Sequence, residues 1–238
     1  MAIIEWKLDE SVVVLTMNSG ENRLNLNFCN AFLDALDEIE DKTQAKALVV
    51  KSADPKIWSN GLDLDWLAEL ARKGERDTAV HFLHRQNALN RRIVTYPMVT
   101  VAAINGHVFA GGAVLCCAFD FRFMRSDRGF FCLPEVDLGI PFLPGMTAML
   151  KTKIPPQLLI EMQLTGKRYT APELESRGSF LKACKTEPET VAEAIAFAKS
   201  LNKERKIVGD LRRVLYEDAV KVIDTVDPSY IELSTLGG

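Results

Sequence analysis

Short apolar strands alternate with amphipathic helices over the first part of the chain, and this alternation limits the fold more than any other feature. Residues 12–17 (VVVLTM) form a β-branched apolar run that ends at turn residues 18–20. Apolar residues then recur at helical spacing over 26–41, and a second apolar run follows at 47–51. A helix between two such strands favours parallel pairing through a right-handed crossover, so the sequence predicts an α/β fold.

The alternation continues to about residue 140. We expect a loop at 52–61, helix over most of 62–95, a short helix that reaches residue 118, and strands at 99–104, 119–124 and 130–133. The charged run at 72–77 interrupts the long helical stretch, either as a solvated turn or as a mobile lid over a ligand.

Beyond Pro155 and Pro156 the sequence has almost entirely helical patterns. Apolar residues that predict one face of a single long helix recur near the end: Ile207, Leu211, Leu215 and Val222. No linker rich in proline, glycine or serine separates the two parts. We therefore expect an α/β core over residues 1–190 and a helical portion over 191–238, which packs on that core or on a neighbouring subunit.

The composition excludes several classes of protein. The formal net charge of the 238 residues is −3, whereas a protein that binds nucleic acid usually has a basic face. No apolar run approaches the roughly 20 residues of a membrane span. The first residues (MAIIEWKLDE) have no basic start followed by an apolar stretch, and residues 236–238 differ from the peroxisomal Ser-Lys-Leu signal. We therefore expect a cytoplasmic protein that binds neither nucleic acid nor membranes.

The cysteine and histidine residues point away from metal chemistry. The five cysteines include no C-x-x-C pair, and the three histidines include no H-E-x-x-H motif. His81 and His84 are three residues apart in a polar stretch that is typical of a solvated helix face. We expect no metal site, and we expect reduced thiols, as in a cytoplasmic protein.

Several common catalytic and nucleotide-binding motifs are absent too. Residues 106–111 match the glycine spacing of a phosphate-binding P-loop, but Gly112 and Ala113 stand where a lysine and a hydroxyl residue are required. No G-x-G-x-x-G follows a predicted strand, and no G-x-S-x-G is present. These absences argue against a P-loop, a dinucleotide-binding loop and the nucleophile elbow of serine hydrolases.

One segment that could carry chemistry is the start of a helix. The strand at 99–104 leads through Gly106 to a helix that opens at Gly111 and Gly112. The unpaired N–H groups of such a helix start attract negative charge, and glycine lets a ligand approach the backbone closely. The alternative is that these small residues only allow tight packing between strand and helix.

A turn and a glutamate are the other two candidates. Residues 59–63 (SNGLD) follow the second strand, and they can cap a helix, offer an N–H group to a ligand, or do both. Glu135 lies among apolar neighbours in 133–141 (LPEVDLGIP), where desolvation would raise its pKa toward the value that a general base needs. The alternative for Glu135 is an exposed loop position.

In this order, the three segments resemble the enoyl-CoA hydratase/isomerase (crotonase) superfamily. The family pattern is a Ser/Ala-x-Gly-x-Asp loop, a strand that runs into Gly-His and Gly-Gly, and a Pro-Glu-x-x-x-Gly segment. The matching residues are 59–63, 99–112 and 134–139, and Asp120, 164–166 and 170–178 are also similar. The resemblance covers nearly the whole chain and implies a crotonase-like spiral of repeated ββα units followed by a helical portion.

The resemblance also implies a set of site residues. The backbone N–H groups of Leu62 and Gly111 would form an oxyanion hole, and Glu135 would be the acid/base residue. Hydratases use a second glutamate, and Val114 stands at that position, which puts hydration in doubt. The pattern of a single glutamate resembles that of the Δ3,Δ2-enoyl-CoA isomerase branch of the family. Residues 22–25 (NRLN) also resemble this branch. The residues that the resemblance places around the acyl-CoA are Arg23, Leu24, Ser59, Asn60, Gly61, Leu62, Asp63, Gly106 and Gly111.

These residues imply an isomerase of fatty acid metabolism that converts a 3-enoyl-CoA into the 2-enoyl-CoA. The acyl-CoA thioester is the substrate and coenzyme A belongs to it, so no separate cofactor is expected. The family usually forms trimers or dimers of trimers, which implies that 191–238 is a trimerisation region. The alternatives are another crotonase-type enzyme (a hydratase, a dienoyl-CoA isomerase with Asp137 as a second acid, or a thioesterase) and a non-catalytic acyl-CoA-binding protein.

Overall fold

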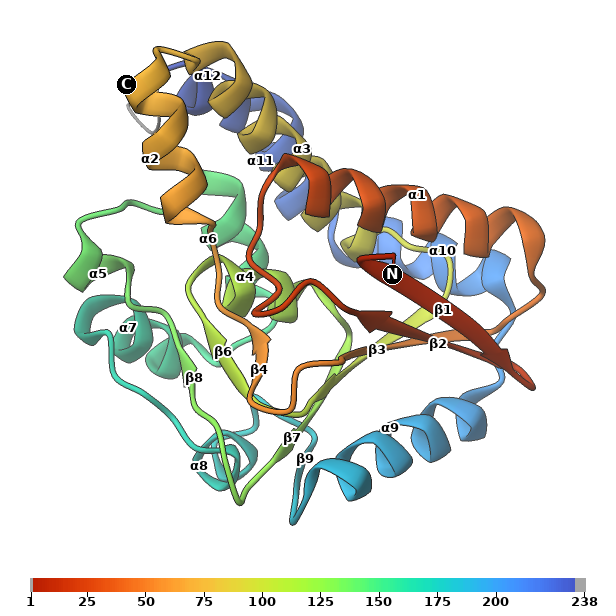
Figure 1. Cartoon of the computed structure of the whole chain (residues 1–238). Helices are drawn as coiled ribbons and strands as arrows, with labels where there is room; N and C mark the ends of the chain where they lie inside the picture. The colour runs from red at the N-terminus through yellow and green to blue at the C-terminus, as the bar shows by residue number, and fades with distance from the viewer. Residues whose placement is uncertain (1, 234–238) are drawn as a thin grey trace.

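Two β-sheets form the centre of the computed structural model, which describes residues 2–233 (Figure 1). The larger sheet has the strand order β1 (Ile4–Asp9), β2 (Val12–Met17), β3 (Ala47–Ser52), β5 (Val99–Ile104), β7 (Phe121–Arg125) and β9 (Lys182–Cys184). The smaller sheet has the order β4 (Ile57–Ser59), β6 (His107–Phe109) and β8 (Phe131–Cys132). Strands β1 and β2 are antiparallel, and the other neighbouring strands are parallel. Residues 236–238, which were considered above for a targeting signal, lie outside the described residues.

Repeated ββα units build both sheets, which confirms the expected spiral. Strands β3, β5 and β7 are neighbours in the larger sheet, and the strand that follows each of them in sequence belongs to the smaller sheet. The helices after these strand pairs are α2 (Leu64–Lys73) and α3 (Arg76–Val94), then α4 (Gly111–Ala118), then α5 (Glu135–Leu138). Because the pairing is parallel, the connections that leave β4 and β6 emerge at the same edge of the smaller sheet.

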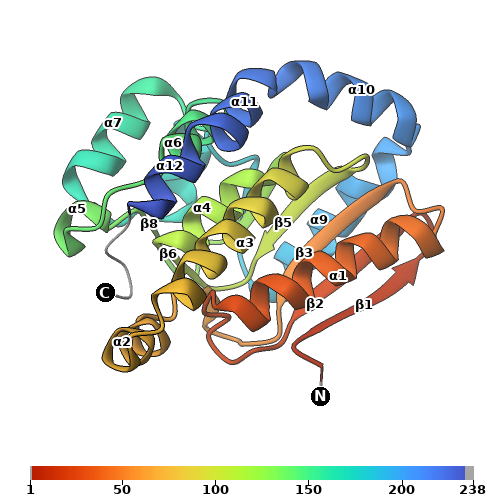
Figure 2. The ribbon, with the colours of Figure 1, turned by 90° about the horizontal axis from the view of Figure 1, so that it is seen from above.

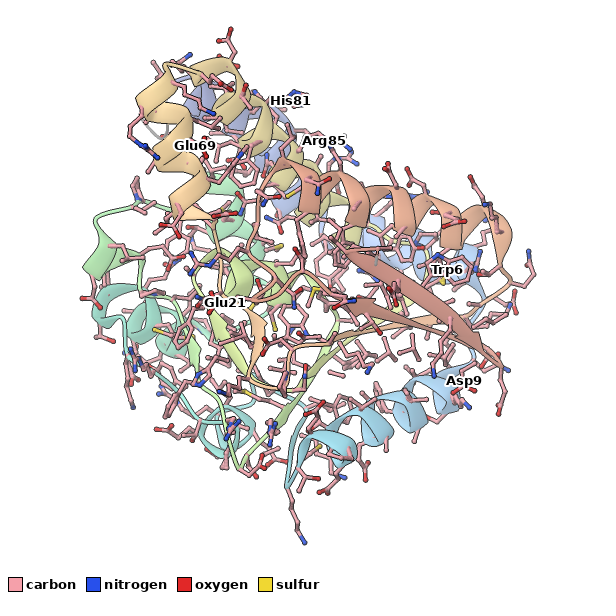
Figure 3. All side chains as sticks on the ribbon, in the orientation of Figure 1. Trp6, Asp9, Glu21, Glu69, His81 and Arg85 are labelled. Carbon is pink, nitrogen blue, oxygen red and sulfur yellow. The ribbon has the colours of Figure 1, made fainter. Side chains whose placement is uncertain are left out.

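Helices cover both faces of the larger sheet. On one side lie α1 (Leu26–Lys42) and α3, and on the other lies α9 (Glu187–Leu201), which packs on Val49, Val101 and Phe123 (Figure 1). Strand β1 is bonded to both layers: the Trp6 indole donates to Glu38 of α1, and Asp9 pairs with Lys199 of α9 (Figure 3). The expected boundary between residues 190 and 191 falls inside α9, so the helical portion that is separate from the sheet begins only after this helix.

The remaining helices extend the fold beyond the sheets. They are α6 (Pro144–Lys151), α7 (Pro156–Thr165), α8 (Ala171–Ser176), α10 (Arg205–Leu215), α11 (Glu217–Thr225) and α12 (Asp227–Glu232). Helices α10 to α12 follow one another around the outer side of α3 and pack on the core of their own chain (Figure 2).

Four strands lie where the sequence did not predict them. The expected loop at 52–61 contains β4, the Gly-His segment forms β6, and β1 and β9 were not predicted. These strands have three to six residues, and β4 and β6 are too short to show a period in the sequence. The run at 72–77 contains a tight turn between α2 and α3. Gly74 adopts a left-handed conformation (φ 69°) that ends α2, and the next residue, Glu75, is the N-cap of α3.

The prediction of one long late helix is wrong, because the helix breaks at Tyr216. This residue leaves the helical region (φ −111°, ψ 13°), and it ends α10 and precedes α11. Its ring is buried beneath the Lys153 ammonium group, and Lys153 Nζ lies 2.5 Å from the tyrosine hydroxyl. The buried contact therefore turns the chain toward the core, whereas a straight helix would lead it away from the core.

A buried polar cluster joins these last helices to the sheet. The Arg212 guanidinium donates to the carbonyl groups of Ile93 and Val94 at the end of α3. It also donates to the carbonyl group of Met98, just before β5, and to Asp120 Oδ2 at 2.7 Å. Asp120 also accepts from the backbone N–H and the hydroxyl of Thr100 in β5. Arg212 thereby provides a donor for the Val94 carbonyl group, at a helix end where carbonyl groups lack partners within the helix.

Replacement of Arg212 by methionine tests this cluster. We expect the free energy of unfolding to fall by about 3–5 kcal/mol, because the largely buried Asp120 loses its nearer cation and keeps only Lys153 at 3.7 Å, while three carbonyl groups lose a donor. Arg213 is the matched control, since its side chain is exposed and pairs only with Asp210, and Arg213→Met should change stability by less than about 1 kcal/mol. Urea unfolding of both variants measures the difference, and equal losses would contradict the anchoring role.

Candidate active site

Gly61 allows two loops to meet at the edge of the smaller sheet. It has a left-handed φ of 78°, and a Cβ atom placed on it would lie 2.8 Å from the Phe109 carbonyl oxygen and 3.1 Å from the Gly111 nitrogen. Only glycine accepts both the conformation and the contact without strain. The turn after β4 therefore lies directly against the start of α4.

This contact brings two unpaired N–H groups to one place. The bridge between Leu24 and Leu62 uses the N–H of Leu24 and of Asp63, so the N–H of Leu62 donates to no described residue. Gly111 is the first residue of α4, and its N–H has no acceptor within the helix. Ala110 precedes it with a φ of 51°, an unfavourable conformation for alanine that strains the turn leading into α4. Leu62 and Gly111 both line one cavity, where their N–H groups could stabilise a negatively charged oxygen.

Both interpretations of the small residues at the start of α4 describe part of the structure. A Cβ atom on Gly112 would lie 2.5 Å from Ser59 Oγ, so this glycine permits the tight packing of α4 on β4. Gly111 lines the cavity, whereas Gly112 does not. The packing role therefore belongs to Gly112 and the ligand-facing position to Gly111.

Residues 59–63 form hydrogen bonds with backbone groups, and two of them also line the cavity. Ser59 is buried and its hydroxyl donates to the Asn22 carbonyl group, while Asp63 caps α2 by accepting from the Trp66 N–H. Asn60 lines the cavity, and its side chain also donates to Glu21 at the surface. A capped helix start and a ligand-facing turn are thus combined in one segment.

Glu135 opens α5 and is the one acidic side chain among the described residues that line the cavity. Only 8% of it is exposed, so the alternative of an exposed loop glutamate is wrong. Its Oε2 atom has no hydrogen-bond partner among residues 2–233. Burial raises the pKa of Glu135 from 4.5 to about 7, because the apolar surroundings disfavour the ionised carboxylate. A carboxyl group with this pKa exchanges protons readily near neutral pH.

The two positions that could hold a second acid differ from Glu135. Val114 is fully buried and lines the cavity as an apolar group. Asp137 is exposed and does not line the cavity, and its carboxylate lies 2.2 Å from the position that a Cβ atom on Gly166 would take. Asp137 thus points toward the end of α7 and away from Glu135's cavity.

The cavity has a volume of ≈ 550 Å³ and mostly apolar walls. Phe109 and Phe142 line it, beside Val114. Lining residues that the sequence analysis missed are Leu83, Gln86, Leu143, Met146, Tyr230 and Leu233. Tyr230 and Leu233 belong to the C-terminal part of the same chain, which therefore forms one wall of the cavity.

Arg23, Leu24 and Gly106, which the resemblance places around the acyl-CoA, are not among the described residues that line the cavity. Arg23 pairs with Glu21 and Asp65 at the surface, and Leu24 is buried against the turn of Leu62. A Cβ atom on Gly106 would lie 2.1 Å from the Lys56 carbonyl oxygen, which gives this glycine a packing role away from the cavity.

The histidines form no second candidate site within the described residues. His107 Nδ1 accepts from the Phe130 N–H, and its ring stacks on Phe109. His81 is exposed on α3 (Figure 3), whereas His84 Nε2 lies 3.1 Å from Glu232 Oε1. Within residues 2–233, no cluster of three or more potential metal-binding side chains occurs, and no helix has the length and apolar character needed to span a membrane.

Comparisons with known proteins identify the family of the chain. The family model described as enoyl-CoA hydratase/isomerase matches residues 7–226. Enoyl-CoA delta isomerase 3 of Arabidopsis thaliana is 26% identical over 229 residues, which cover 94% of this chain and 95% of the relative. A probable enoyl-CoA hydratase of Bacillus subtilis is 27% identical over 92% of this chain and 84% of the relative.

Solved structures share the fold at lower identity. Human mitochondrial delta3-delta2-enoyl-CoA isomerase superposes with a TM-score of 0.85 at 20% identity, over 97% of this chain and 90% of that one. A probable enoyl-CoA hydratase of Mycobacterium tuberculosis has a TM-score of 0.87 at 21% identity, over 97% of this chain and 95% of that one. The crotonase-type fold is thereby confirmed. Because the family model also matches almost the whole chain, the protein belongs to the enoyl-CoA hydratase/isomerase family of acyl-CoA enzymes.

Proposed function

We propose that the protein is a Δ3,Δ2-enoyl-CoA isomerase that uses Glu135 as its single acid/base residue. The observation that carries this proposal is one buried carboxyl group, with a pKa of about 7, in an apolar cavity that also presents two unpaired backbone N–H groups. Three curated relatives from Arabidopsis thaliana that are named enoyl-CoA delta isomerases support it.

The first step is removal of a proton from C2 of a 3-enoyl-CoA by the Glu135 carboxylate. The electron pair of the broken C–H bond moves onto the thioester oxygen, which becomes an enolate. The N–H groups of Leu62 and Gly111 bind this oxygen, and they are already oriented before the charge develops. Removal of one such donor typically raises a barrier by about 2.7–4 kcal/mol.

The second step returns the proton to C4. Protonated Glu135 donates it while the enolate collapses, and the double bond moves to C2–C3, in conjugation with the thioester. One carboxyl group serves both steps because it ends in the protonation state in which it began. Val114, Phe109 and Phe142 exclude water from the reacting carbons, which disfavours hydration of the product.

The reaction needs no group besides the chain and its substrate, since coenzyme A arrives as part of the thioester. All five cysteines are buried free thiols. This state suits a reducing compartment and supports our proposal of a cytoplasmic location.

Replacement of Glu135 by glutamine tests the assignment. We expect the rate of 3-hexenoyl-CoA isomerisation to fall by about 10²–10⁴-fold, because the amide neither accepts nor returns the proton. The appearance of the conjugated enoyl thioester absorbance measures the rate, and a fall of less than tenfold would contradict the proposal. Asp137→Asn is the matched control, since Asp137 lies two residues away and faces Gly166, and it should retain wild-type activity. Loss of activity in the control would favour a dienoyl-CoA isomerase with two acids.

The activity should also depend on pH in a defined direction. Glu135 acts first as a base, so only its ionised form starts the reaction, and its pKa is raised to about 7. We expect kcat/KM to increase about tenfold per pH unit below 7 and to level off above it. A profile that is flat between pH 5 and pH 8 would show that Glu135 is not the titrating base.

We also propose that the chain forms trimers through α10. Four apolar side chains on this helix are each more than half exposed: Ile207, Leu211, Val214 and Leu215. Their spacing of four, three and one residues places them on one face, and a contiguous apolar patch of this kind is typical of a contact surface.

The assembly is tested by Leu211→Asp, which places a charge on this exposed face without disturbing the core. We expect the variant to be monomeric by size-exclusion chromatography with light scattering, whereas the wild type is trimeric or a dimer of trimers. Lys206→Ser changes an exposed polar position of the same helix and should leave the assembly intact. A wild-type chain that is monomeric at every concentration would contradict the proposal.

A further inference from the structure

The cavity continues from a buried interior to an exposed apolar rim. Val114 and Met146 line it as buried side chains. Four large side chains line the same cavity and are nevertheless 43–82% exposed, and we call them the rim: Leu64, Leu138, Tyr230 and Leu233. Neither step of the proposed reaction uses them. Exposed apolar side chains that are continuous with a ligand cavity are typical of a binding surface.

The cavity is larger than the reacting atoms require. The sulfur and oxygen of the thioester and the carbons from C1 to C4 are comparable to six water-sized groups. At about 30 Å³ for each group, they fill about a third of the ≈ 550 Å³. The remaining volume has room for the arm of coenzyme A next to the sulfur and for a chain that continues beyond C4.

Coenzyme A and the acyl chain require walls of different character. Asn60 lines the cavity, and its carboxamide and the Arg23 guanidinium both donate to Glu21 at the surface. This polar side suits the amides and phosphates of coenzyme A. The wall formed by α5, α6 and the loop between them, together with α12, is apolar apart from Glu135 and the Tyr230 hydroxyl group. An alkyl chain is therefore favoured along this second wall.

Contacts at both ends of α12 hold the outer part of the apolar wall in place. Asp227 opens α12 and is fully buried, and its Oδ1 atom accepts from the N–H of Gly145 in α6 at 2.7 Å. At the other end, Glu232 Oε1 lies 3.1 Å from His84 Nε2 of α3 (Figure 2). Tyr230 lies between these two contacts. The rim is therefore formed before a ligand arrives, so a chain that binds there orders little of the protein.

We propose that the preferred substrate is a long-chain 3-enoyl-CoA, whose distal methylene groups lie on Tyr230 and Leu233. This inference rests on the proposed function for the position of the thioester. A short chain leaves these two side chains in water. A longer chain covers them, which removes apolar surface of both the chain and the protein from water. Tyr230 and Leu233 thus determine the preference for chain length and take no part in proton transfer.

The test compares the binding of saturated CoA thioesters, which cannot be isomerised. Isothermal titration calorimetry on the wild type measures the dissociation constants of hexanoyl-, octanoyl-, decanoyl- and dodecanoyl-CoA, each below the concentration at which it forms micelles. Full burial of one methylene group improves affinity about fourfold, and a group that lies on an exposed wall gains about half of that free energy. We therefore expect the dissociation constant to fall about twofold for each methylene group added to hexanoyl-CoA.

Replacement of Leu233 by serine tests the position of the distal chain. This side chain is 82% exposed, so its loss should not disturb folding. We expect the ratio of the dissociation constant of hexanoyl-CoA to that of dodecanoyl-CoA to fall at least about threefold. Leu8→Ser is the matched control, because Leu8 is 51% exposed on β1 and does not line the cavity, and it should keep the wild-type ratio.

Two results would overturn the inference. One is wild-type protein that binds dodecanoyl-CoA no more tightly than hexanoyl-CoA, which needs no variant. The other is a ratio that is the same in Leu233→Ser as in Leu8→Ser, which would place the distal chain away from the rim. Failure of the wild type to isomerise both 3-hexenoyl-CoA and 3-dodecenoyl-CoA would contradict the proposed function but would leave the binding comparison intact.

Discussion

The site depends on the contact between Gly61 and the backbone at the start of α4. Parallel pairing of β4 and β6 brings the two loops to the same edge of the smaller sheet, but a side chain at position 61 would still hold them apart. With glycine there, Leu62 and Gly111 line one cavity. In the proposed mechanism the donors are backbone N–H groups, so the identity of the side chain at position 62 matters little to them.

The apolar cavity disfavours the charged form of the Glu135 carboxyl group, but it strengthens hydrogen bonds from N–H groups to a charged oxygen. Burial disfavours the ionised form of Glu135 and raises its pKa to about 7, which makes it an effective proton carrier near neutral pH. The same exclusion of water strengthens any bond between the two N–H groups and a charged oxygen. Glu135 Oε2 and Gln86 Oε1 remain unpaired, and these unfavourable burials must be offset elsewhere, as in the cluster around Arg212 and Asp120.

The sequence predicts the parts of this fold that have a clear period. Residues 12–17, 26–41 and 47–51 lie within β2, α1 and β3, as predicted. Each of these runs is long enough for its apolar pattern to be recognised. Strands β4 and β6 have three residues each, and their burial comes from tertiary pairing that no local pattern reveals. The break at Tyr216 depends in the same way on Lys153, a residue 63 positions away. Glu135 could be identified from its motif and apolar neighbours, whereas Gln86 could have been noticed only as a polar residue between Leu83 and Leu89 on an apolar helix face.

The C-terminal helices contribute to two separate surfaces. Helix α10 presents an exposed apolar face, and Tyr230 and Leu233 at the end of the chain line the cavity. Between them, Arg212 and Tyr216 hold the chain to Asp120 and Lys153 in the core. Because this buried anchor lies between the two helical segments, it fixes the direction in which the chain leaves α10 and so the position of Tyr230 and Leu233. The C-terminal wall of the cavity is therefore positioned by buried polar contacts within the chain.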